Sequence, residues 1–409
     1  MPYPRLRYVE AIQIEHEGKP MVVLRDPEDL IGNTLIVPMP LFMIMTLLDG
    51  RRGASEIQQV LARAAGGQMF PAAELDRIVR EMDELYLLEN ERTAARRLAV
   101  EQSFAALLTR PATHAGGAYP AEPEACAQMF EEFFKDLELD GHDARPRGLL
   151  APHIDLRVGG QTLARALATL GARRPPKLYI ILGVAHHPAK NLFTLTEKSF
   201  ETPLGLAETD RAAAARLKEL YGAGRLDGEY VHKNEHSVEF PAVALRYLHR
   251  AQPGFKILPL LCGSLHECLA PGAASAAAPP PAALGDVRDF IAALRQLIAE
   301  WGGDVCIIAS VDLSHVGLKF GDEKGIDQAR LEHIRARDAE MLERVQALDP
   351  EGFLDHFRPD ANSRNVDAVT AVYVMLHALG PGRGKLIDYQ QWHEQETDSM
   401  VSFAGLAIY

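Results

Sequence analysis

The 409-residue chain has few cysteines and no long hydrophobic run. Its four cysteines, Cys126, Cys262, Cys268 and Cys306, form no CxxC pair, so neither a disulfide framework nor a zinc ribbon is predicted. No stretch approaches the roughly 18 consecutive apolar residues of a membrane-spanning helix. The N-terminal segment carries acidic and polar residues where a signal peptide needs an apolar run. We therefore expect a cytoplasmic protein with no membrane partner.

Positive charge is also scarce. The chain has 43 lysines and arginines against 56 acidic residues, a formal net charge of −13, and no basic cluster. A phosphate backbone would be repelled, so nucleic acid is not an expected partner. The sequence has no GxxxxGK[ST] phosphate loop, GxSxG nucleophile elbow or HExxH zinc helix, and the functions built on these motifs are not predicted.

The length predicts two domains, because a domain usually holds about 100 to 200 residues. Residues 1–100 contain short strand-like pieces at 8–14, 21–24 and 35–37, followed by helical patterns, which predict a winged-helix-like module. Acidic residues outnumber basic ones in this segment. That balance favours a peptide or protein partner over DNA.

Residues 105–409 are predicted to form an α/β domain. Apolar runs alternate with helical patterns, which predicts a mostly parallel or mixed sheet sandwiched by helices. The predicted strands are 149–154, 178–184, 255–262, 305–311 and 401–408, and the predicted helices are 161–171, 286–301, 327–347 and 365–379. The Pro/Ala-rich segment 270–284 is predicted to be a surface insertion.

Histidines and an aspartate follow three of these strands. His153 follows the first, His186 the second, and Asp312 and His315 the strand that begins at residue 305. Because ligands in open α/β sheets collect beyond the carboxyl ends of strands, these side chains are expected to share a pocket. Imidazole suits iron, copper, zinc or nickel. The sequence therefore predicts a metal site with His153, His186 and His315 as ligands.

The role of Asp312 separates two kinds of metal site. If Asp312 binds directly, two histidines and one carboxylate form the facial triad of non-haem Fe(II) oxygenases. If it only orients His315, three histidines resemble a zinc site with an open water position, which serves hydrolysis. The spacing of the residues leaves both alternatives open.

A further histidine, His236, lies in the polar block 234–239 ahead of a helical pattern. It is a candidate for proton transfer. The alternative interpretation is structural: Ser237 caps the helix, while Glu235 and Glu239 are solvated or pair with nearby bases.

Several short blocks together resemble a known family. They occur in one order over residues 105 to 409: 113–119 (THAGGAY), 151–153 (APH), 182–187 (LGVAHH), 235–239 (EHSVE), 310–315 (SVDLSH) and 398–405 (DSMVSFAG). They resemble the Memo family, which includes the AmmeMemoRadiSam system protein B of bacteria and archaea.

The resemblance implies a fold similar to the LigB-type class III extradiol dioxygenases, which use non-haem iron. It places metal ligands at His153, His186 and His315, with Asp312 and His236 as catalytic residues beside them. Fe(II) is the metal it favours, with copper or zinc as alternatives. The family often has a cysteine near a Cys-Gly-Arg-like segment. Here Asn362 is interpreted as standing in its place, so cysteine-dependent copper or redox chemistry is not expected.

The expected function is a metal-dependent oxidoreductase of dioxygenase type that acts on an unknown small-molecule substrate. Two alternatives stay open: a non-catalytic metal-binding scaffold that binds partners through its N-terminal module, and a metal-dependent hydrolase. The usual neighbours of the family include a radical S-adenosylmethionine enzyme, so a radical SAM system protein is the partner expected by association.

Overall fold

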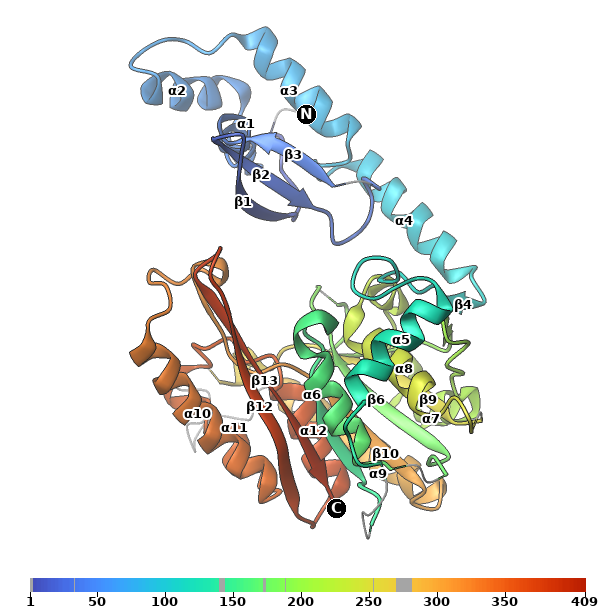
Figure 1. Ribbon diagram of the computed structural model, residues 1–409. Coiled ribbons are helices and arrows are strands. Elements are labelled where there is room, and N and C mark those ends of the chain that lie inside the picture. The colour runs from blue at the N-terminus through green and yellow to red at the C-terminus, as the bar shows by residue number, and fades with distance from the viewer. Residues whose placement is uncertain are drawn as a thin grey trace. The chain divides into compact units, whose positions relative to one another are not determined.

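The structure is a computed structural model that describes residues 3–32, 34–139, 144–171, 174–187, 189–252, 254–269 and 282–409. The chain divides into two compact units, Met1–Ala106 and Leu107–Tyr409 (Figure 1). Most of the predicted surface insertion, residues 270–281, lies outside the described residues. Within the described residues, no helix has both the length and the apolar character that a membrane crossing requires.

The N-terminal unit consists of an antiparallel sheet and helices. Its elements are β1 (Glu10–His16), β2 (Lys19–Arg25), β3 (Leu35–Pro38), α1 (Met39–Met45), α2 (Ala54–Ala64), α3 (Ala72–Glu84) and α4 (Glu91–Ala105). Glu17 and Gly18, both with positive φ, form the tight turn that joins β1 to β2. The sheet has the order β1-β2-β3. The winged-helix-like arrangement stays a prediction.

The C-terminal unit is built around one large sheet. Its strands are β4 (Thr109–Arg110), β5 (Gly148–Ala151), β6 (Leu178–Val184), β7 (Phe193–Leu195), β8 (Ser199–Phe200), β9 (Lys256–Cys262), β10 (Val305–Ser310), β11 (His315–Gly317), β12 (Gly384–Glu394) and β13 (Ser399–Ile408). Its α-helices are α5 (Pro123–Phe134), α6 (Leu156–Ala168), α7 (Arg211–Tyr221), α8 (His236–Leu248), α9 (Ala282–Glu300), α10 (Gln328–Gln346), α11 (Pro350–Asp355) and α12 (Val369–Leu379).

The large sheet is mixed. Its order is β11-β13-β5-β10-β6-β9-β7, with β12 paired to the other side of β13. The four central strands β5, β10, β6 and β9 are parallel, whereas β13 runs antiparallel to β5 and β7 antiparallel to β9. The predicted α/β class with a mixed sheet is therefore confirmed.

Helices cover both faces of this sheet, because its central strands are apolar on both sides. In β6, Ile180 packs in a core with α7, α9 and α12, while the next residue, Ile181, packs in a second core with α5, α6 and α8. Both side chains are fully buried, and burial of such a side chain contributes about 1.5–3 kcal/mol. The two cores hold the central strands rigidly, so their ends form a fixed platform.

One strand boundary and one whole strand differ from the prediction. The strand predicted at 149–154 ends at Ala151, so His153 lies in the loop that follows it. Strand β12 was not predicted, because its residues are largely polar and half-exposed: it lies at the edge of the sheet and pairs only with β13.

Candidate metal centre

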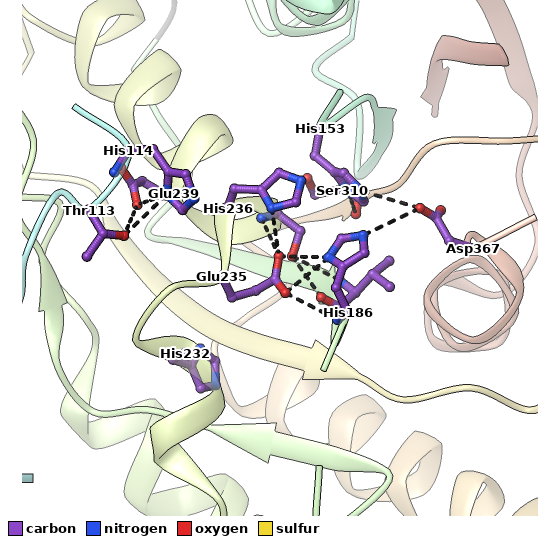
Figure 2. Close-up of polar contacts among 12 residues, drawn as sticks. Thr113, His114, His153, His186, His232, Glu235, His236, Glu239, Ser310 and Asp367 are labelled. Atoms are coloured by element: carbon purple, nitrogen blue, oxygen red, sulfur yellow. Dashed lines mark hydrogen bonds and ion pairs between the residues drawn. The ribbon is translucent and has the colours of Figure 1, made fainter. Parts of the chain in front are cut away.

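The ends of three parallel strands lie level with one another. In the strand register, Ser310 of β10 is opposite Ala151 of β5, and Ala309 is opposite Leu182 of β6. The loops after these strands therefore leave the sheet at the same edge. Figure 2 shows His153 and His186 from two of these loops pointing toward one another, with His236 beside them.

His153 is almost completely buried, at 1% exposure. Its Nδ1 donates a hydrogen bond to the carbonyl of Ser310 at 2.9 Å. Because Nδ1 carries the proton of the neutral ring, Nε2 holds the lone pair. Nε2 lies 3.3 Å from Oδ2 of Asp367 and 3.6 Å from Oδ2 of Asp312.

The acids around His153 favour a positive charge at this point. Burial lowers the pKa of His153, but the charges of Asp312 and Asp367 outweigh burial and raise that pKa to about 10. A carboxylate within a few ångströms stabilises the charged form of an imidazole, and it stabilises a bound cation for the same reason. The position beyond Nε2 therefore suits either a proton or a metal ion.

His186 is oriented by Glu235, the N-cap residue of α8. Nδ1 of His186 lies 3.0 Å from both carboxylate oxygens of Glu235, and its backbone N–H donates to the same group. The carboxylate only accepts, so Nδ1 donates and Nε2 keeps its lone pair. Burial raises the pKa of Glu235, but the charge and hydrogen bond of His186 outweigh burial and hold it well below the usual range. This arrangement matches the carboxylate–histidine pairs that orient metal ligands.

Asp367 faces both imidazoles. It comes from the segment just before α12, and its Oδ2 lies 3.3 Å from Nε2 of His153 and 3.9 Å from Nε2 of His186. Its Oδ1 accepts a hydrogen bond from the backbone N–H of Asp312 at 3.0 Å. Its Oδ2 is buried and has no hydrogen-bond partner. A buried oxygen without a donor is costly, and a cation there would remove the cost.

Asp312 lies on the other side of His153. Its Oδ1 accepts hydrogen bonds from the backbone N–H groups of His153 and Ile154, at 3.1 and 3.2 Å. Burial, together with the neighbouring charge of Asp367, raises the pKa of Asp312. His153, Asp312 and Asp367 form one of two groups of potential ligands whose atoms lie within 4.8 Å of one another.

His236 belongs to the other group, together with His153 and His186. Its ring stacks on His186 with centroids 4.8 Å apart and meets His153 edge-on at 5.1 Å. Burial lowers the pKa of His236 well below its usual value, and the charges of His186 and His153 add to this effect. His236 is therefore a neutral imidazole beside the candidate ligands.

His315 lies in neither of the two groups found among the described residues. Its Nδ1 donates to the carbonyls of Leu313 and Asn365, at 3.0 and 3.1 Å. It begins β11, and its charge lowers the pKa values of Asp312 and Asp367. Of the three histidines predicted to share an ion, His153 and His186 lie next to each other and to Asp367. His315 lies outside this arrangement.

Sequence reasoning missed Asp367 and the orienting role of Glu235. Asn362, interpreted as standing in place of the family cysteine, uses its side chain to bind both backbone groups of Val366. From the same segment, Asp367 reaches the histidines instead. The alternative interpretation of the block at 234–239 was also wrong in part, because Glu235 caps α8 while Ser237 Oγ bonds to the backbone of Val184.

Glu239 forms a separate buried cluster next to the histidines. Its carboxylate accepts from Arg110, from the hydroxyl of Tyr119 and from both the backbone and Nδ1 of His114. Burial raises the pKa of Glu239, but His114 and Arg110 outweigh burial and lower it to about 2. The ring of His114 lies 5.7 Å from that of His236. This cluster fixes the wall of the site at α8.

Comparison with known proteins shows the family of the chain. The family model described as Memo-like protein matches residues 110–278 and 284–407. The chain belongs to the Memo-like family. A MEMO1 family protein of Aquifex aeolicus is 28% identical over 411 residues, covering 99% of this chain and all of the relative. One of Thermus thermophilus is 29% identical over 357 residues, covering 87% of this chain and 99% of the relative.

The family match includes every candidate site residue but not the N-terminal unit. His153, His186, Asp312 and Asp367 all lie within the matched residues, which begin at 110. A MEMO1 family protein of Thermococcus kodakarensis is 27% identical and covers 72% of this chain but 97% of its own length. The N-terminal unit therefore lies outside the family model, while the alignment with the Aquifex aeolicus relative, at 99% of this chain, includes it.

Proposed function

We propose that this Memo-like protein binds one metal ion through His153, His186 and Asp367, and that it acts as a metal-dependent oxidoreductase. One observation carries the proposal. The Nε2 atoms of His153 and His186 lie 3.3 and 3.9 Å from the buried Oδ2 of Asp367, so two imidazoles and one carboxylate converge on one point. A proton or a metal ion between these atoms gives each of them a favourable partner, and a metal ion can be shared by all three.

The donor set favours Fe(II). Two histidines and one carboxylate make the facial triad of non-haem iron oxygenases, which leaves positions open for oxygen and a substrate. When bound, Fe(II) supplies the one-electron and oxygen chemistry that protein side chains lack. Copper and zinc, which also bind imidazole, are the competing metals.

The surrounding residues orient the ligands and manage protons. Glu235 holds the ring of His186, and the carbonyl of Ser310 holds the ring of His153, so both Nε2 atoms point inward. His236 is positioned to exchange a proton at the site, since its ring centroid lies 4.8 Å from that of His186 and 5.1 Å from that of His153. Asp312 supports Asp367 through its backbone N–H.

The proposal includes a LigB-like arrangement of the C-terminal unit and a partner-binding role for the N-terminal unit. A LigB-like arrangement of the C-terminal unit is supported by the mixed sheet with its candidate ligands at the carboxyl ends of parallel strands. A partner-binding role for the N-terminal unit is supported by its position outside the family match. A radical SAM system protein is the proposed partner.

The test is metal binding under anaerobic conditions. Protein purified without oxygen and titrated with Fe(II) is expected to bind one ion per chain, measured by elemental analysis after gel filtration. His153→Ala is expected to lose this ion, whereas His333→Ala, which removes an exposed histidine from α10, is expected to keep it. Folded wild-type protein that stays free of iron, or equal binding by both variants, would contradict the proposal.

Oxygen consumption separates the reaction classes. The iron-loaded protein is expected to consume oxygen when a substrate is added, as followed with an oxygen electrode. If the zinc-loaded protein instead hydrolyses esters or amides without oxygen, the site is that of a hydrolase and the proposed reaction is wrong.

A further inference from the structure

A cavity of about 380 Å³ adjoins the candidate metal centre. Its wall is made by the ends of β6 and β9, by the segment 361–367 and by the first residues of α12. Asp367 both lines this cavity and belongs to the proposed ligand set. The volume lies within the range of small-molecule sites, about 300–1,000 Å³.

Apolar side chains form a large part of the cavity wall, and Ser264, His266 and Thr370 add polar groups. Val184 and Ala185 contribute from the end of β6, Leu269 from the segment after β9, and Val366 and Val369 from the approach to α12. The thiol of Cys262 also lines the wall, and burial raises its pKa, so it stays protonated. Binding of a ligand against such a wall is stabilised by about 25 cal/mol for each Å² of apolar surface removed from water.

The described lining of the cavity holds no permanent positive charge. Among its described lining residues there is no lysine or arginine, the only basic side chain is the imidazole of His266, and the only acidic side chain is Asp367. The side chains of Asn362 and Asn365 are already used, since their amides donate to the carbonyls of Val366 and His315. A carboxylate or phosphate would lose water here, meet the charge of Asp367 and gain no lysine or arginine as a partner.

We infer that this cavity is the substrate site, and that it takes a small, uncharged, largely apolar molecule and excludes carboxylates and phosphates. The inference rests on the proposed function in one respect: the cavity matters for chemistry because it ends at Asp367. Selection by charge itself depends only on the wall, and it holds in the metal-free protein.

Saturation-transfer NMR on metal-free protein tests the inference with two ring compounds of similar size. Benzyl alcohol is expected to give a clear signal, and benzoate at the same concentration a signal at least several-fold weaker. Ala185→Phe, which fills the cavity from a partly buried position, is expected to abolish the benzyl alcohol signal. Ala251→Phe, in an exposed turn away from the cavity, is the matched control and is expected to bind as wild type does.

The Asp367→Asn variant tests the charge argument. The amide keeps the shape of the side chain but removes the only acidic group of the wall, so benzoate is expected to bind this variant several-fold better than wild type. Equal signals for the two compounds in wild type would overturn the inference, as would benzyl alcohol binding that Ala185→Phe leaves unchanged.

Failure of this inference and failure of the proposed function give different results. Iron binding that depends on His153, without benzyl alcohol binding in the cavity, refutes only the substrate site. Cavity binding in a protein that takes up no metal keeps the charge selection and refutes the proposed function.

Discussion

Two buried aspartates in the C-terminal unit, Asp338 and Asp367, differ in how completely they are hydrogen-bonded. Asp338 accepts from Arg364 and from the hydroxyls of Ser314, Ser402 and Tyr389, so both its oxygens are occupied. Asp367 has one oxygen bound to a backbone N–H and another with no donor.

This difference separates a structural cluster from a functional one. Asp338 lies on α10 and its partners come from β12, β13 and the loops before β11 and α12, so its carboxylate joins parts of the chain distant in sequence. A carboxylate satisfied in this way stabilises the fold and has no capacity left for a ligand. Asp367 keeps such capacity, and it faces the lone pairs of two imidazoles. An incomplete cluster inside a well-packed core therefore indicates a bound ligand.

The largest expected loss of stability comes from removing Asp338, whose oxygens are all hydrogen-bonded. Asp338→Ala leaves the charge of Arg364 buried without its carboxylate, which typically costs about 3–5 kcal/mol. Urea unfolding followed by circular dichroism is expected to show this loss, with the C-terminal unit partly unfolded at 37 °C. A change below about 1 kcal/mol would mean that the cluster is not a stabilising element.

Glu239 gives the next largest effect, and it depends on pH. The pKa of Glu239 is lowered from 4.5 to about 2, so its contribution to stability is present above about pH 4.5 and is lost as pH falls through about 2. Glu239→Gln is expected to lower the free energy of unfolding at pH 7 by about 3 kcal/mol.

The same variant is expected to differ less from wild type as pH falls from 4.5 toward 2. Urea titrations at pH 7, 4 and 3 measure this convergence. Parallel curves for the two proteins over that range would show that Glu239 titrates normally in the folded protein.

A smaller effect, on metal affinity, is expected when Glu235, which orients His186, loses its charge. Glu235→Gln keeps a hydrogen-bonding group beside His186 but removes its charge, and changes of this type weaken metal affinity about 10- to 100-fold. Anaerobic calorimetry with Fe(II) measures the loss. Affinity equal to that of wild type would mean that His186 is not a ligand.

The smallest effect on stability is expected at Asp367 itself. In metal-free protein, Asp367→Asn removes a charge whose Oδ2 has no donor but which also attracts His153, so the two effects oppose each other and the free energy of unfolding is expected to change by only about 1–2 kcal/mol. Iron binding is nevertheless expected to be lost. A loss of stability like that of Asp338→Ala would place both aspartates in the same structural class.

The sequence predicts the residues that follow strands. His153, His186 and Asp312 each come shortly after an apolar run, so the strand pattern alone brings them to one edge of the sheet. Asp367 follows no strand. It ends a segment in which Asn362 and Asn365 adopt left-handed backbone conformations, and these turns decide which polar side chain points inward. Neither periodicity nor spacing encodes that choice.

His315 shows what the position of a strand end does not predict. It follows the same apolar run as Asp312, but it begins a new strand, β11, whose pairing with β13 opposite Val401 fixes its direction. That pairing depends on long-range register between distant segments. The position of a residue after a predicted strand therefore indicates that it lies at the edge of the sheet. Tertiary contacts decide which of these residues contact one another.

An anomalous diffraction map recorded at the iron edge, from crystals grown anaerobically with Fe(II), tests the central claim most directly. We predict a single peak within bonding distance of Nε2 of His153, Nε2 of His186 and Oδ2 of Asp367. A peak bound by His315 with Asp367 uninvolved, or no peak while these three side chains keep their positions, would contradict the account.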